Sequence, residues 1–162
     1  MVDLGSMAQS VGALLKEREQ TVAVAESSAG GLISAALLAV PGASAYFLGG
    51  GVVYTHASRG ALLSIPKDAF EGLQPGAEEF GLRLARVARD HLGAVWGVGE
   101  SGAAGPAGSR YGYDAGHAVV AVAGPVEDAL ILETGHADRV KNMWAFAAAA
   151  LGLLEASIKK GG

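Results

Sequence analysis

Three short segments of this sequence combine hydroxyl, histidine or arginine side chains with glycine: residues 25–31, 47–63 and 100–108. Each lies at or just after a stretch that is predicted to be a strand. In open α/β sheets, ligands bind at the edge where parallel strands end, and glycine lets the backbone approach a ligand closely. We therefore expect these segments to meet in one site.

Ser27 is the leading candidate for a nucleophile. It follows the apolar run 21–25 and precedes Gly30, Gly31 and a predicted helix. Free N–H groups at the start of that helix could stabilise an oxyanion beside the serine hydroxyl. The alternative is an ordinary helix cap, for which serine is among the preferred residues, and the spacing alone favours this cap. Ser28 fits either role.

Tyr54, His56 and Arg59 form a second group. Histidine can act as an acid or a base near neutral pH, and tyrosine can relay a proton or stack on a ring. Arginine stays protonated and binds phosphate or carboxylate in a bidentate manner. The alternative is the solvated start of a helix after a strand, which the spacing alone favours.

The third segment, residues 100–108, is rich in glycine, and its backbone amides could hold an anion. It lacks both the Gly-Lys-Ser/Thr of a Walker A loop and the Gly-x-Gly-x-x-Gly spacing of a dinucleotide site. The alternative is a flexible crossover. His91, His117 and His136 are far apart and show no metal-ligand spacing, so we interpret them as structural and expect no metal.

The composition excludes several classes of protein. The 162 residues are 51% hydrophobic and 17% charged, which excludes disorder, and no apolar run is long enough to span a membrane. The chain has no cysteine, which excludes disulfides, thiolate metal sites and a cysteine nucleophile. The net charge of −4 disfavours direct binding to nucleic acid. Without an apolar N-terminal signal region, the sequence predicts a cytoplasmic location.

The low charge and the many small side chains also predict a homo-oligomer, because apolar surface would be buried between subunits. The alternative is an alanine-rich composition imposed by the base composition of the genome.

Hydrophobic patterning predicts an α/β fold, a single three-layer α/β/α domain with a mixed sheet of about five strands. Helices are expected over residues 7–18, 32–38, 56–63, 76–92 and 137–160, and strands over 21–25, 49–55, 94–99, 117–123 and 129–133, the last two forming a hairpin. Residues 66–73 are expected to form a turn or a short helix. The domain spans residues 7–162, and residues 1–6, which precede a second methionine, are interpreted as a vector remnant.

Taken together and in this order, these segments resemble the CinA C-terminal domain family, whose members include bacterial nicotinamide mononucleotide (NMN) deamidases. The family motif Ala-Glu-Ser-Cys-Thr-Gly-Gly is matched by residues 25–31, and Val-Pro-Gly-Ala-Ser-Ala-Tyr-Phe-Leu-Gly-Gly stands unchanged at residues 40–50. Val-x-Tyr-Ser/Thr-Asn is matched by residues 52–56, Thr-Gly-Ile-Ala-Gly-Pro by residues 101–106, and a late Gly-Asp-Arg by residues 137–139.

The resemblance implies an amidohydrolase that converts NMN to nicotinic acid mononucleotide and ammonia without a metal or other cofactor. It implies that Ser27 attacks the amide carbon, helped by Tyr54 and by a family lysine at the position of Arg59. The substrate, a small pyridine nucleotide, would contact a wider set of residues: Ser28, Gly30, Gly31, Ser101, Gly102, Gly105 and Arg139.

The sequence departs from the family pattern at the position of the base. Arg59 cannot serve as a base as the family lysine can, and His56, which replaces an asparagine, could take over that role. Ser28 and Ala29 replace Cys-Thr. One alternative is therefore a catalytically impaired domain that binds a nucleotide or a partner linked to competence or DNA damage. Another is a different serine hydrolase with His56 as its base.

Overall fold

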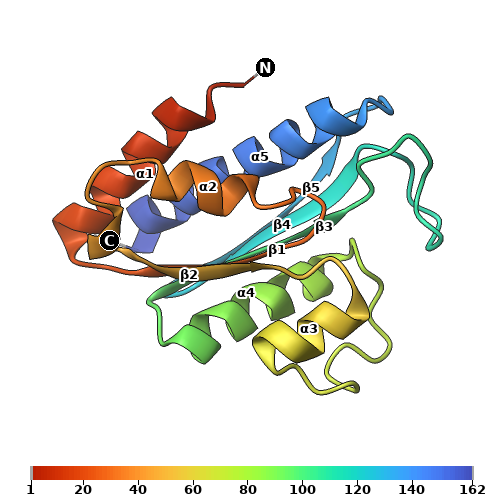
Figure 1. Ribbon diagram of the computed structural model, residues 1–162, viewed down its shortest axis with the longest axis horizontal. Coiled ribbons are helices and arrows are strands. Elements are labelled where there is room, and N and C mark those ends of the chain that lie inside the picture. Colours follow the sequence, from red (N-terminus) through yellow and green to blue (C-terminus); the bar gives the residue numbers. More distant parts are fainter. Residues whose placement is uncertain (1, 162) are drawn as a thin grey trace.

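The computed structural model describes residues 2–161 and shows a five-stranded sheet between two layers of helices (Figure 1). Helices α1, α2 and α5 cover one face of the sheet, and α3 and α4 cover the other. This arrangement confirms the predicted three-layer α/β/α fold. The helices are α1 (Leu4–Arg18), α2 (Leu32–Leu38), α3 (His56–Leu63), α4 (Glu78–Leu92) and α5 (Arg139–Gly161), with a 3-10 turn at Ala43–Ala45; the strands are β1 (Val22–Glu26), β2 (Phe47–Val52), β3 (Trp96–Gly102), β4 (His117–Ala123) and β5 (Glu127–Glu133).

The strand order of the sheet is β2-β1-β3-β4-β5. The carboxyl ends of β2, β1 and β3 lie next to one another, at the same end of the sheet. β1 is parallel to both β2 and β3, whereas β4 is antiparallel to β3 and forms the predicted hairpin with β5. Ala25 pairs with both Gly51 and Gly99. The next residues of β1 and β3, Glu26 and Glu100, therefore reach the same edge.

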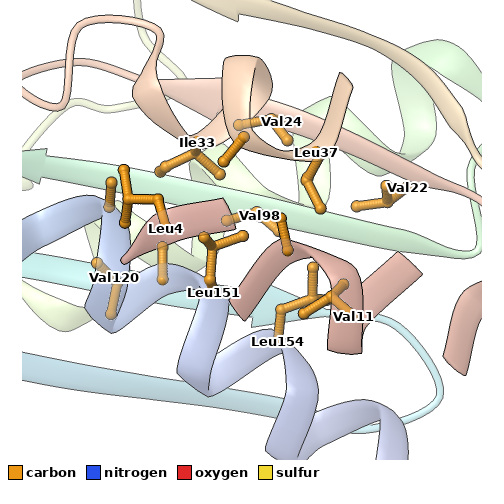
Figure 2. Packing of buried hydrophobic residues seen from close by; sticks show 14 of the residues in the cluster. Leu4, Val11, Val22, Val24, Ile33, Leu37, Val98, Val120, Leu151 and Leu154 are labelled. Atoms are coloured by element: carbon orange, nitrogen blue, oxygen red, sulfur yellow. The ribbon is translucent and has the colours of Figure 1, made fainter. Parts of the chain in front are cut away.

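The main core lies between the sheet and the layer formed by α1, α2 and α5. Figure 2 shows Val24 of β1, Val98 of β3 and Val120 of β4 facing Ile33 of α2 and Leu151 of α5, and all five are buried. Strands buried on both faces are nearly continuous apolar runs, as they are here in β1 and β4. None of the helices within residues 2–161 combines the length and the apolar character needed to cross a bilayer.

On the other face, α4 packs unusually close to β3. A Cβ atom at Gly97 would overlap the backbone carbonyl of Ala85, and one at Gly99 would overlap that of Gly81. The alternating glycines of β3 thus let the helix backbone approach the strand directly. This contact fixes β3, and with it Glu100, against the rest of the fold.

Three helices begin at other residues than the sequence predicts, and α4 begins at Glu78 and not at residue 76. α1 begins at Leu4, three residues before the expected start, because Asp3 accepts a hydrogen bond from the Ser6 amide and Leu4 packs in the core. The origin of residues 1–6 as a vector remnant stays a prediction, and Met1 lies outside the described residues. α5 begins at Arg139 and not at residue 137.

Strand bounds are shifted too: β1 covers Val22–Glu26 and not 21–25, β5 begins at Glu127 and not at residue 129, and β3 begins at Trp96 and not at residue 94. β2 covers Phe47–Val52, so that residues 53–55 lead into α3 and do not extend the strand. β3 runs on through Glu100, Ser101 and Gly102, which were expected to belong to a loop. These three residues pair with Val120, Val119 and Ala118 of β4, and this ladder keeps the glycine-rich segment extended. Residues 66–73 form turns without a helix.

Candidate functional site

A cleft of about 490 Å³ lies where β1, β2 and β3 end. Six of the predicted site residues line it together: Ser27, Tyr54, His56, Arg59, Ser101 and Gly102. They come from the three segments that the sequence singled out. The rest of the wall is formed by Thr55, Pro75, Ala103 and the loop residues Ser109, Arg110, Tyr111 and Tyr113.

The turn that carries Ser27 is held from beneath by Glu100, a fully buried residue. One oxygen of Glu100 accepts the backbone N–H groups of Ser27 at 2.9 Å and Ala29 at 2.8 Å. The hydroxyl of Ser28 donates a hydrogen bond to the other oxygen. Burial raises the pKa of Glu100 to about 7, with a further rise from the charge of Glu26, while the three hydrogen bonds act in the opposite direction.

Sequence reasoning did not single out Glu100 as a site residue. The signal was present, since a glutamate stands in an otherwise apolar and glycine-rich strand. A charged group in such a strand requires hydrogen-bond partners, because burying it unpaired is costly.

A second buried carboxylate, Glu26, caps the start of α2. It accepts the backbone N–H groups of Gly31 at 2.9 Å, Ile33 at 3.1 Å and Ser34 at 2.9 Å, and the Ser34 hydroxyl at 2.8 Å. The N-cap residue of α2 is Gly31, which has no side chain to offer. The interpretation of Ser27 or Ser28 as the cap of this helix is therefore wrong.

The expectation of several free N–H groups at this helix start holds for one amide only. The amides of this turn are taken by Glu26, by Glu100 and by backbone carbonyls. Among the amides of residues 27–34, all of them within the described part of the chain, that of Ser28 alone has no acceptor. It is thus the one donor of the turn that can serve an oxyanion.

Arg139 links Tyr54 to the loop that follows β3. Its Nη2 donates to the Tyr54 hydroxyl at 3.3 Å, and its Nη1 donates to the carbonyl of Gly105. The buried Asn142 holds the same loop by donating to the Ala104 carbonyl at 2.8 Å. Arg139 therefore orients Tyr54 at the rim of the cleft.

The guanidinium of Arg59 lies over two aromatic rings, 5.3 Å from the centroid of Phe80 and 5.8 Å from that of Phe70. Its Nε is buried and has no hydrogen-bond partner within residues 2–161. Burial lowers the pKa of Arg59, and Tyr111 acts against this decrease. The ring contacts offset part of the cost of burial, and the unpaired Nε–H favours an anionic ligand.

The cleft is lined by basic side chains, although the chain as a whole is acidic. Its wall contains Arg59, Arg110 and His56 and no acidic side chain, although the chain carries a net charge of −4. Tyr111, over which Arg110 lies at 5.2 Å, and Tyr113 add aromatic surface. The arrangement suits an anion that carries a planar ring.

The remaining predicted site residues do not line the cleft. Ser28 and Gly31 lie behind Ser27, bonded to the buried carboxylates, Gly30 faces Met143, and Gly105 and Arg139 contact each other. His56 does line the cleft and is also the exposed first residue of α3, whose start is capped by Thr55.

His117 is buried against the Gly76 carbonyl and Glu133 and does not line the cleft. Within residues 2–161, no three His, Asp or Glu side chains lie close enough together to hold a metal ion.

Comparison with known proteins gives a family match over nearly the whole chain. A model of the CinA C-terminal domain matches residues 4–158. A CinA-like protein of Prochlorococcus marinus is 43% identical over 120 residues, which are 74% of this chain and 28% of that protein. A CinA-like protein of Desulforapulum autotrophicum is 35% identical over 151 residues, 92% of this chain and 36% of that protein. The chain thus spans about a third of the length of these relatives.

Solved structures share the fold at low identity. A competence/damage inducible protein of Agrobacterium tumefaciens superposes with a TM-score of 0.88 at 24% identity, covering 98% of this chain and 97% of the other. A CinA superfamily protein of Klebsiella pneumoniae gives a TM-score of 0.90 at 20% identity, covering 98% and 99%. These likenesses show a common open α/β architecture.

Proposed function

The chain belongs to the CinA C-terminal domain family, and on that premise we propose that it is an amidohydrolase that deamidates NMN to nicotinic acid mononucleotide and ammonia. The observation that supports this most strongly is the cleft that brings Ser27 together with a cationic, aromatic wall. NMN is an anion with a planar ring and a carboxamide, and this is the chemistry that such a wall recognises.

In the proposed reaction, the hydroxyl of Ser27 attacks the carboxamide carbon, and the free N–H of Ser28 stabilises the oxyanion. His56, which lines the same cleft, takes the serine proton and returns it to the nitrogen as the C–N bond breaks and ammonia leaves. Water then attacks the acyl group, with His56 again as the base, which releases the carboxylate product and the free serine.

The other residues of the cleft bind the substrate. Arg59 and Arg110 hold the phosphate, which suits the paired N–H groups of a guanidinium. Tyr111 and Tyr54 offer surfaces for the pyridine ring and the ribose. The reaction is proposed to take place in the cytoplasm, and the homo-oligomer expected from the composition stays a prediction.

The experiment that tests this function is ammonia release from NMN by the purified chain, compared with release from nicotinamide riboside. The riboside carries the same carboxamide and lacks the phosphate. We expect turnover of NMN, and a KM for the riboside at least about tenfold higher, because a charge-assisted hydrogen bond contributes about 1.5–3 kcal/mol. An absence of ammonia from both compounds contradicts the proposal.

Replacing Arg59 with glutamine is expected to raise the KM for NMN by about 10- to 100-fold and to change kcat less, since the lost contacts bind the phosphate in both the ground state and the transition state. Steady-state kinetics measure both constants. The matched control is Arg83→Gln on the exposed surface of α4, outside the cleft. An unchanged KM in Arg59→Gln means that Arg59 does not hold the phosphate.

A second candidate function, a binding domain without turnover, is favoured by one observation, the arginine at position 59 where the family has lysine. Such a domain gives a thermal shift with NMN, since a ligand at a hundred times its Kd adds about 2.7 kcal/mol, and releases no ammonia. Ammonia release gained in Arg59→Lys identifies this case, because the cleft is then intact and only the base is missing.

A further inference from the structure

The buried side chains of Glu100 and Ser28 have no part in the reaction proposed above, which uses only the backbone N–H of Ser28. Glu100 is fully buried on β3, and Ser28 is also buried. Burying a carboxylate is costly unless its oxygens are hydrogen-bonded, and the neighbouring residue on β4 is the apolar Val120. An apolar side chain at position 100 would avoid that cost. We therefore look for the role of the carboxylate in its hydrogen bonds to the turn of residues 27–29.

Glu100 fixes the turn on both sides of Ser28. The same oxygen accepts the amides of Ser27 and Ala29, and the other oxygen contacts the Ser28 hydroxyl. The direction of the Ser27 side chain and of the free Ser28 amide follows from the backbone between these bonds. In the proposed function these are the nucleophile and the oxyanion donor.

We propose that Glu100 is a positioning residue for Ser27, and that its ionised form is the one that aligns the nucleophile. This inference rests on the proposed function. When Glu100 is ionised, both amides and the Ser28 hydroxyl donate to it, and charge-assisted bonds of this kind are the stronger ones. When Glu100 is protonated, its own O–H must donate to Ser28, and the direction of that hydrogen bond is reversed.

The pH dependence has a definite sign. The pKa of Glu100 is raised by burial to about 7, so the carboxylate gains its proton as the pH falls through neutrality. Turnover should therefore fall on the acid side. Glu26, at the end of the adjacent strand β1, is the charged side chain that acts on Glu100 directly, and it favours the protonated form.

The test uses Glu100→Gln, which keeps the shape of the protonated side chain and cannot ionise. Glutamine can accept the Ser27 and Ala29 amides and donate to Ser28, so the variant is expected to fold. We expect kcat for NMN to fall by about 10- to 100-fold with less than about a twofold change in KM, because a small misalignment of reacting atoms acts on the chemical step. Glu17→Gln on the exposed surface of α1 is the matched control.

A second readout does not depend on activity. In a pH titration followed by NMR, the backbone amides of Ser27 and Ala29 are expected to shift together with one midpoint near neutral pH in the wild type, and to lose that step in Glu100→Gln. Turnover depends on every group that takes part in the reaction, whereas these two amides donate directly to Glu100 and report its protonation alone. Glu100→Asp, which keeps the charge and shortens the side chain, should retain a titration and still lose kcat.

The outcomes separate the two proposals. Common titration of the two amides without ammonia from NMN overturns the proposed function and, with it, the role of Glu100 in catalysis. Turnover with amides that do not titrate together, or with equal kcat in the wild type and Glu100→Gln, overturns the positioning role alone.

Discussion

Ammonia release from NMN is expected to disappear when Ser27 is replaced with alanine, with kcat reduced by at least about 10⁴-fold. The physical reason is that no other group in the proposed reaction can form the acyl intermediate, so removing the hydroxyl removes the whole covalent route. Ser27 is 9% exposed and lines the cleft, and its amide and not its hydroxyl is bonded to Glu100. The fold and the affinity for NMN should therefore be nearly unchanged.

The measurement is steady-state turnover together with calorimetric titration of NMN into both proteins. Ser101→Ala is the matched control, since Ser101 is the hydroxyl from β3 that lines the same cleft. It should lower kcat far less than Ser27→Ala does. Equal losses in the two variants, or a Ser27→Ala protein that keeps a tenth of the wild-type turnover, would mean that a water molecule or another hydroxyl attacks the amide.

The meeting of Ser27, Tyr54 and Ser101 in one cleft was predictable from the sequence. Each of these residues follows or ends a strand, and parallel strands that share one sheet place their ends at one edge. The elements themselves were predictable where the apolar patterns are strong, as in helix α2 and strand β4, whose bounds match the prediction. The predicted ends of strands and helices differ from the observed ones where backbone hydrogen bonds, and not the side-chain pattern, set the end. Glu100, for example, belongs to β3 because it pairs with β4.

The hydrogen-bond acceptors of the backbone amides around Ser27 could not be predicted in the same way. The strand–serine–glycine–helix pattern indicates free N–H groups, but it says nothing about a carboxylate from another strand. Glu100 is 73 residues away from Ser27 in sequence and reaches it only through the β1–β3 pairing. Whether an arginine lines the cleft also depends on tertiary contacts that the sequence does not reveal. Arg139 donates to Tyr54 and Gly105 and does not line the cleft.

The largest loss of stability is expected when Glu26 is replaced with alanine. Its carboxylate accepts three backbone amides and one hydroxyl at the start of α2, a helix of seven residues whose N-cap is glycine. Each donor left buried without an acceptor costs about 1–3 kcal/mol. The free energy of unfolding should therefore fall by at least about 3 kcal/mol, a large part of the 5–15 kcal/mol typical of a domain.

Urea denaturation followed by circular dichroism measures this loss as a shift of the midpoint at constant slope. Ser34→Ala is the matched control, because it removes one of the four donors to the same carboxylate and should cost about 1 kcal/mol. If Glu26→Ala costs no more than Ser34→Ala, then water replaces the carboxylate at the start of α2, and this helix end is more open than its buried amides indicate. If the loss is as large as expected, the carboxylate of Glu26 secures the helix that follows the turn of Ser27, and Glu100 is left as the carboxylate proposed to align the nucleophile.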